Sequence, residues 1–116
     1  MDAFDHVNHS VYLTYLEECR DRLVEAFGDG AIDRFVIRRL EVDYMSQLRQ
    51  ADGAVDTACS VVGVGTTSVR TAEEVHACSD GRLVALATCV LVHLDTDRAV
   101  PEPLPAELRA RLEPPA

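Results

Sequence analysis

The first part of the chain repeats apolar residues with the period of a helix. Between about residues 9 and 27 they recur at alternating intervals of four and three, at Tyr12, Leu16, Cys19, Leu23 and Ala26. Charged residues fall on the opposite face, and the turn from Gly28 to Gly30 supplies the glycine that commonly ends a helix. The pattern predicts one long helix with a single buried face.

The chain between residues 35 and 94 has the shorter period of β-strands. Residues 35–44 alternate, with Val36, Leu40, Val42 and Tyr44 on one side and Arg39, Glu41 and Asp43 on the other. Arg38 shares the side of Val36 and Leu40, where it would line a site, pair across an interface or extend to solvent at an edge.

Three more strands complete the pattern. Residues 54–64 and 66–78 follow a turn signal that ends at Gly53 and lie on either side of Gly65, which predicts a hairpin. Residues 83–94 form a nearly continuous apolar run, typical of a strand near the middle of a sheet. Together these elements predict an α+β fold, in which an antiparallel sheet covers one long helix.

The end of the chain differs in composition from the rest. All five prolines lie between residues 101 and 116. We expect one domain over residues 1–100 and a loosely attached, proline-rich tail over residues 101–116, with a short helix between Pro105 and Leu112.

Composition narrows the class of protein. With 116 residues, 47% of them apolar, the chain can close one core. The net charge of -9 argues against nucleic acid or an anionic membrane as a partner. There is no apolar run long enough to span a bilayer and no secretion signal, so we expect a cytoplasmic protein.

The cysteines and the basic residues exclude further kinds of site chemistry. The four cysteines lack metal-ligand spacing, so we expect buried, reduced thiols and neither a metal site nor a disulfide framework. We also expect no cofactor. All 11 basic residues are arginine, which excludes a Schiff base but leaves guanidinium groups for phosphates.

The start of the predicted helix is the main candidate for chemistry. Asn8 is a plausible N-cap, and its capping bond would leave the amide of His9 free to point at a ligand. An amide at the positive end of a helix stabilises a developing oxyanion, while a nearby carboxylate such as Asp2 acts on a carbonyl carbon or on water. This combination indicates acyl chemistry.

The same segment resembles the signature of hotdog-fold thioesterases of the 4-hydroxybenzoyl-CoA thioesterase type. That signature runs Asp-x-x-Gly-His-Val-Asn-Asn-x-x-Tyr-x-x-Tyr-x-Glu, whereas this chain has Asp5 in place of the glycine and His9 in place of the second asparagine. The matching positions are Asp2, His6, Val7, Asn8, Tyr12, Tyr15 and Glu17. The resemblance implies a hotdog fold whose opening strand is missing from this chain.

The resemblance also implies roles for residues in and after the signature. Asp2 would be the nucleophile or the general base for water, although as a terminal residue it could merely complement the helix dipole. The His9 amide would polarise the thioester carbonyl. Glu17 would be an alternative carboxylate that orients water, or a solvated or structurally paired side chain.

Substrate contacts are expected from several residues. His6 would position substrate or Asp2, and Asn8 and Tyr12 complete the contacts at the helix start. Ser68 and Arg70 share a strand face after Gly65. The segment from Gly65 to Arg70 resembles a Gly-x-x-Ser region of the same thioesterases, which implies that a pantetheine arm or a partner subunit could pass here, although a hairpin turn uses the same residues. Other candidates for nucleotide phosphates are Arg38, Arg39 and Arg82.

The residues and the resemblance together predict an acyl-CoA thioesterase that releases a free acid and coenzyme A. The resemblance also implies a homodimer or homotetramer. The main alternative is a hotdog module that binds acyl-CoA or an acyl carrier without turnover. A hotdog dehydratase, with His6 as its catalytic histidine, ranks last.

Overall fold

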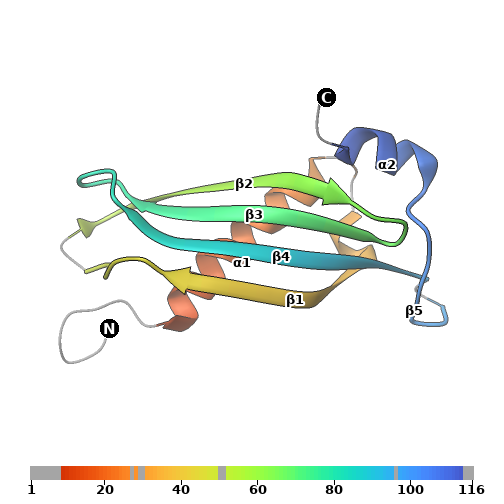
Figure 1. The fold of residues 1–116 in the computed structure, drawn as a ribbon, viewed down its shortest axis with the longest axis horizontal. Helices are drawn as coiled ribbons and strands as arrows, with labels where there is room; N and C mark the ends of the chain where they lie inside the picture. Colours follow the sequence, from red (N-terminus) through yellow and green to blue (C-terminus); the bar gives the residue numbers. More distant parts are fainter. Residues whose placement is uncertain (1–8, 27, 29–30, 50–51, 96, 114–116) are drawn as a thin grey trace.

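A computed structural model describes residues 9–26, 28, 31–49, 52–95 and 97–113. Helix α1 (His9–Glu25) lies across one face of an antiparallel sheet (Figure 1). The four long strands are β1 (Phe35–Tyr44), β2 (Val55–Val64), β3 (Ser68–Ala77) and β4 (Leu83–Asp95), in the order β1-β4-β3-β2. The predicted α+β architecture, an antiparallel sheet around one long helix, is confirmed.

Shorter elements complete the chain. A 3-10 helix, η1 (Ala31–Arg34), leads into β1, and the two-residue strand β5 (Val100–Pro101) pairs with the end of β4. Helix α2 (Ala106–Leu112) forms where the sequence predicts a short helix. No described helix combines the length and apolar character needed to cross a bilayer.

The buried face of α1 differs from the predicted one. Among the helix side chains that the structure describes, the buried ones are every fourth residue, namely Tyr12, Leu16, Arg20 and Val24. Cys19 and Leu23 are half-buried and Ala26 is exposed. The four-and-three pattern missed this face because it passed over Arg20, a charged residue that points into the protein.

Among the described residues, two apolar clusters fill the interior between α1 and the sheet. The first, near the helix start, contains Tyr12, Leu16, Leu48, Val75, Ala77, Val84, Ala85 and Ala87. The second, toward the other end of the helix, contains Val24, Phe35, Val69, Cys89, Leu91, Leu104 and Leu112. Arg20 lies on α1 between Leu16 and Val24, so it marks the boundary between the clusters.

A β-bulge in β1 changes which side chains face the helix. The pairing with β4 shifts between Ile37 and Arg39, so Arg38 is the extra residue. Leu40 and Val42 after the bulge pack against the core, but Val36 before it is 46% exposed. The prediction that Val36 and Arg38 share the face of Leu40 is therefore wrong, because a bulge reverses the alternation.

The C-terminal segment is attached more firmly than the sequence suggested. Leu104 and Leu112 are buried in the second cluster, and the Leu104 amide donates a hydrogen bond to the Thr66 carbonyl at 3.0 Å. The expectation of a loosely attached tail is wrong, because these two leucines complete the core.

The four cysteines are free, but the expectation that all four are buried is wrong. Cys89 is buried, Cys19 and Cys59 are half-buried, and Cys78 is exposed. Burial raises the pKa of Cys59 to about 12, and the nearby Glu73 carboxylate adds to the effect. This thiol therefore stays protonated at neutral pH.

Candidate active site

The described part of helix α1 starts at His9, the residue at which the sequence places the beginning of the helix. Helix α1 begins at His9, so the His9 amide is among the first four N–H groups, which have no acceptor within the helix. Asp2, His6 and Asn8 lie outside the described residues. Their predicted roles therefore rest on the sequence signature.

Tyr12 ties the first turns of α1 to the chain that follows β1. Its hydroxyl accepts a hydrogen bond from the Leu48 amide at 3.0 Å, and its ring makes an edge contact with Tyr44, with centroids 5.3 Å apart. Tyr12 is 4% exposed. The ring is therefore an anchor that fixes the helix start against the sheet.

The chain that follows β1 is also held by hydrogen bonds and ion pairs from Arg82. The Arg82 guanidinium donates to the Gln47 carbonyl at 2.7 Å, to Asp52 at 2.7 Å and to Asp80 at 2.8 Å. Arg82 holds the pKa of Asp52 well below its usual range, and its amide and side chain lower the pKa of Asp80. Arg82, a candidate for phosphate binding, is engaged within the chain.

Glu17 lies on the solvent-facing side of α1, where it is exposed. It belongs to an acidic stretch with Glu18, Asp21 and Glu25. Partial burial, together with the charge of Glu17, raises the pKa of Asp21. The described neighbours of Glu17 therefore make that side of the helix strongly negative.

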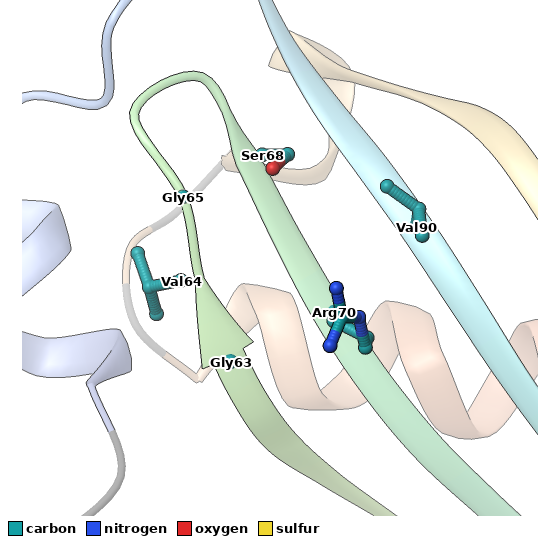
Figure 2. A pocket seen from close by; sticks show the side chains of 6 residues that line it. All are labelled: Gly63, Val64, Gly65, Ser68, Arg70 and Val90. Carbon is teal, nitrogen blue, oxygen red and sulfur yellow. The ribbon is translucent and has the colours of Figure 1, made fainter.

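Ser68 and Arg70 lie at the other end of the molecule, on the face of the sheet away from α1. Both line a hollow of about 220 Å³ beside the β2–β3 turn, together with Gly63, Val64, Gly65 and Val90 (Figure 2). Arg70 also lines an adjoining hollow of about 270 Å³ with Arg39 and Glu41. The predicted shared face of Ser68 and Arg70 is confirmed.

Within one chain, the helix start lies far from the hollow that contains Ser68 and Arg70. Tyr12 packs near Val75 and Ala77 at the far end of β3, whereas Ser68 is its first residue. Strand β3 has 10 residues and spans about 30 Å at about 3.4 Å per residue. The helix start and the Ser68 hollow are therefore separated by the length of the sheet and by its thickness.

Sequence reasoning missed a buried ion pair beneath the middle of α1. Arg20 donates two hydrogen bonds of 2.7 Å to the Glu73 carboxylate, which also accepts one of 2.7 Å from the Thr71 hydroxyl. Burial opposes the charge of Arg20, but the pairing with Glu73 outweighs it and raises the Arg20 pKa. The signal available in the sequence was a charged residue at an inward-facing position, Arg20 on α1 and Glu73 on β3.

Comparison with known proteins identifies the family. A model described as the thioesterase-like superfamily matches residues 1–112. No curated protein matches the chain significantly.

Solved structures are similar over nearly the whole chain. A thioesterase from Thermus thermophilus, in complex with coenzyme A and Zn, is 32% identical with a TM-score of 0.87, covering 97% of this chain and 82% of its own. A predicted thioesterase from Bacillus stearothermophilus is 29% identical with a TM-score of 0.84, covering 96% and 84%. The probable thioesterase YbaW from Escherichia coli, 24% identical with a TM-score of 0.80 and coverage of 97% and 87%, shares the fold.

The element order, the sheet around a single helix and these similarities agree with the hotdog fold that the N-terminal signature predicts. The chain belongs to the thioesterase-like superfamily.

Proposed function

We propose that the protein is an acyl-CoA thioesterase, which hydrolyses an acyl thioester to a free acid and coenzyme A. The observation that carries the proposal is the helix start at His9, fixed to the sheet through Tyr12 and Leu48, in a chain of the thioesterase-like superfamily. A similar thioesterase from Thermus thermophilus forms a complex with coenzyme A.

In this mechanism, the substrate carbonyl lies at the positive end of α1. The His9 amide donates a hydrogen bond to the oxyanion that forms as the carbonyl is attacked; one such donor is worth about 3 kcal/mol of barrier. Asp2 attacks the carbonyl carbon as a nucleophile or removes a proton from the attacking water. The thiolate of coenzyme A is a good leaving group and needs no strong acid.

The remaining predicted residues have supporting roles. His6 and Asn8 orient the substrate and the helix start, and Glu17 is the alternative carboxylate on α1. Ser68 and Arg70 contact a distant part of the substrate. We place the reaction in the cytoplasm, a reducing compartment in keeping with four free cysteines.

We propose that the active form is a homodimer or homotetramer. The support is the separation of the helix start from Ser68 and Arg70, which exceeds the reach of a pantetheine arm within one chain. A second copy that brings its own hollow toward the helix start would remove this separation.

Replacing Asp2 tests the enzyme proposal. We expect the Asp2→Asn variant to lose at least ~100-fold of kcat on acyl-CoA while still binding coenzyme A. Glu18→Gln removes one charge from the exposed side of α1 and is the matched control. Glu17→Gln, assayed in parallel, decides which carboxylate acts.

Two replacements in the signature, Asp5 and His9, favour one alternative, a module that binds acyl-CoA without turnover. Tight binding of acyl-CoA by the parent protein, with no hydrolysis of short, long or aromatic acyl groups, would establish that alternative. Dehydration of a hydroxyacyl thioester would instead identify a dehydratase.

A further inference from the structure

Two cysteines from different elements lie beside the buried ion pair beneath α1. Arg20 on α1 binds Glu73 on β3, and Cys19 is the residue before Arg20. Cys59 on β2 lies directly opposite Glu73 in the β2–β3 pairing, and directly opposite residues of an antiparallel pair share a face of the sheet. The ion pair therefore holds the Cys19 turn of the helix against the Cys59 position of the sheet.

The two thiols contact each other. Cys19 and Cys59 share a hydrogen bond between their side chains, and both are half-buried. A disulfide requires Cβ atoms within about 4.5 Å of each other and side chains that point toward one another. Thiols that share a hydrogen bond already point toward one another. A rotation of the side chains with a small shift of α1 against β2 completes the approach.

The sheet keeps Cys59 away from the two cysteines of the later strands. Cys89 is on β4, and β3 lies between β4 and β2. Two strand spacings amount to about 10 Å, more than the roughly 7 Å between Cα atoms that a disulfide can span. The Cys78 amide bonds the Ala54 carbonyl, five residues and so about 17 Å along the chain from Cys59. Cys59 therefore has Cys19 as its partner within the fold.

We propose that Cys19 and Cys59 form a peroxide-sensitive dithiol, which closes to a disulfide within one chain and ties the middle of α1 to β2. The inference is independent of the proposed thioesterase activity, because neither thiol belongs to the machinery at the helix start. In the reduced protein both thiols are part of the packing between α1 and the sheet. In the oxidised protein they join the helix to the sheet covalently.

The oxidation takes place in two steps. The Cys19 thiol gives its proton to solvent, and its sulfur attacks one oxygen of hydrogen peroxide; the O–O bond breaks, which yields a sulfenic acid and one water. The Cys59 sulfur then attacks the sulfenic sulfur and loses its proton, and the hydroxyl group leaves as a second water. The two thiols thus lose two electrons and two protons, and one peroxide molecule takes up both.

The surroundings of the two sulfur atoms set the order of these steps. Burial raises the pKa of Cys59 to about 12, and the Glu73 carboxylate adds to the effect, so Cys19 reacts first. The Arg20 guanidinium acts in the other direction, because its positive charge lowers the pKa of Cys59. This charge supports the second step, in which Cys59 loses its proton.

Peptide mapping identifies the bond directly, because trypsin separates the four cysteines. All 11 basic residues are arginine, and cleavage after them leaves one cysteine in each of the peptides 1–20, 50–70, 71–82 and 83–98. After treatment of the folded protein with hydrogen peroxide and alkylation of the remaining thiols, we expect peptides 1–20 and 50–70 to be linked, and dithiothreitol to separate them. Cys78→Ser removes the exposed thiol and should leave the yield unchanged, whereas Cys19→Ser or Cys59→Ser should abolish the linked pair.

Stability provides a second measurement. The disulfide closes the loop over residues 19–59 and constrains the unfolded chain, so we expect the urea midpoint to rise on oxidation and to return with dithiothreitol. Peroxide should not raise the midpoint of Cys59→Ser. The inference is overturned if the folded protein yields no linked peptides while Cys78 is oxidised, or yields a mixture of pairings. A midpoint that stays the same or falls on oxidation also overturns it, because a strained bond would show that the two thiols are not placed for bridging.

Discussion

The two faces of the sheet treat their charged residues in opposite ways. On the inner face, Arg20 and Glu73 are 2% and 0% exposed and satisfy each other beneath α1. On the outer face, Arg70 is exposed beside a hollow. Glu74, the residue after Glu73, points to the outer face, where it is half-buried and its carboxylate lies 3.0 Å from the His76 ring. The inner face pairs its charges away from water, and the outer face exposes its charges to solvent.

The largest expected effect comes from breaking the inner ion pair. Glu73→Gln leaves the Arg20 charge buried without a counter-ion, and we expect a loss of about 3–5 kcal/mol in the free energy of unfolding. Glu74→Gln, one residue away on the outer face, should change it by less than about 1 kcal/mol. Urea denaturation of both variants measures the contrast.

The same pair allows a sharper form of this prediction. In the double variant Arg20→Leu/Glu73→Leu both charges are absent, so most of the lost stability should return. If the double variant is as unstable as Glu73→Gln, the cost comes from altered packing, and the unpaired charge is not its cause.

A smaller effect is expected at the helix start. Tyr12→Phe removes the acceptor of the buried Leu48 amide, and we expect a loss of about 1–3 kcal/mol by urea denaturation. Thr88→Ala on the exposed outer face should stay within about 0.5 kcal/mol of the parent. Parent-like stability of Tyr12→Phe would mean that the Tyr12 ring alone anchors the helix.

The smallest effect should appear as a change in pH dependence. Arg82 lowers the folded-state pKa of Asp52 and Asp80, so their contribution to stability is present above the ordinary aspartate value of 3.8 and is lost as the pH falls through the lowered values. In Arg82→Gln this part of the acid-induced loss should disappear, giving a flatter curve of urea midpoint against pH below 3.8. An unchanged slope would mean that these exposed pairs are fully screened by solvent.

The sequence predicted the positions of helices and strands better than the contacts between them. Strand β1 lies at the predicted residues 35–44, because charged and apolar side chains alternate there. The bulge at Arg38 was not visible, since an extra residue in one strand has meaning only against its partner β4. The inward direction of Arg20 was missed for a related reason. A charged residue is placed inside a protein by a counter-charge 53 positions away, and local periodicity carries no information on that partner.

The predictions about the candidate site separate in the same way into local features and long-range ones. The helix start at His9 and the shared face of Ser68 and Arg70 follow from local rules of capping and alternation. Their separation along β3 and across the sheet depends on how α1 crosses the strands, which short-range patterns do not encode. The attachment of α2 was missed because two leucines in a proline-rich segment give a weak signal.

The position of Leu104 and Leu112 in the second apolar cluster has a consequence for biosynthesis. A chain that emerges from the ribosome with its first 95 residues contains all four long strands, but it lacks two members of the cluster that surrounds Phe35 and Val69. That half of the interior stays open to water until residue 112 has left the exit tunnel. Native packing in this half is therefore completed after synthesis of the sheet, during a short interval in which the nascent chain exposes apolar surface to chaperones.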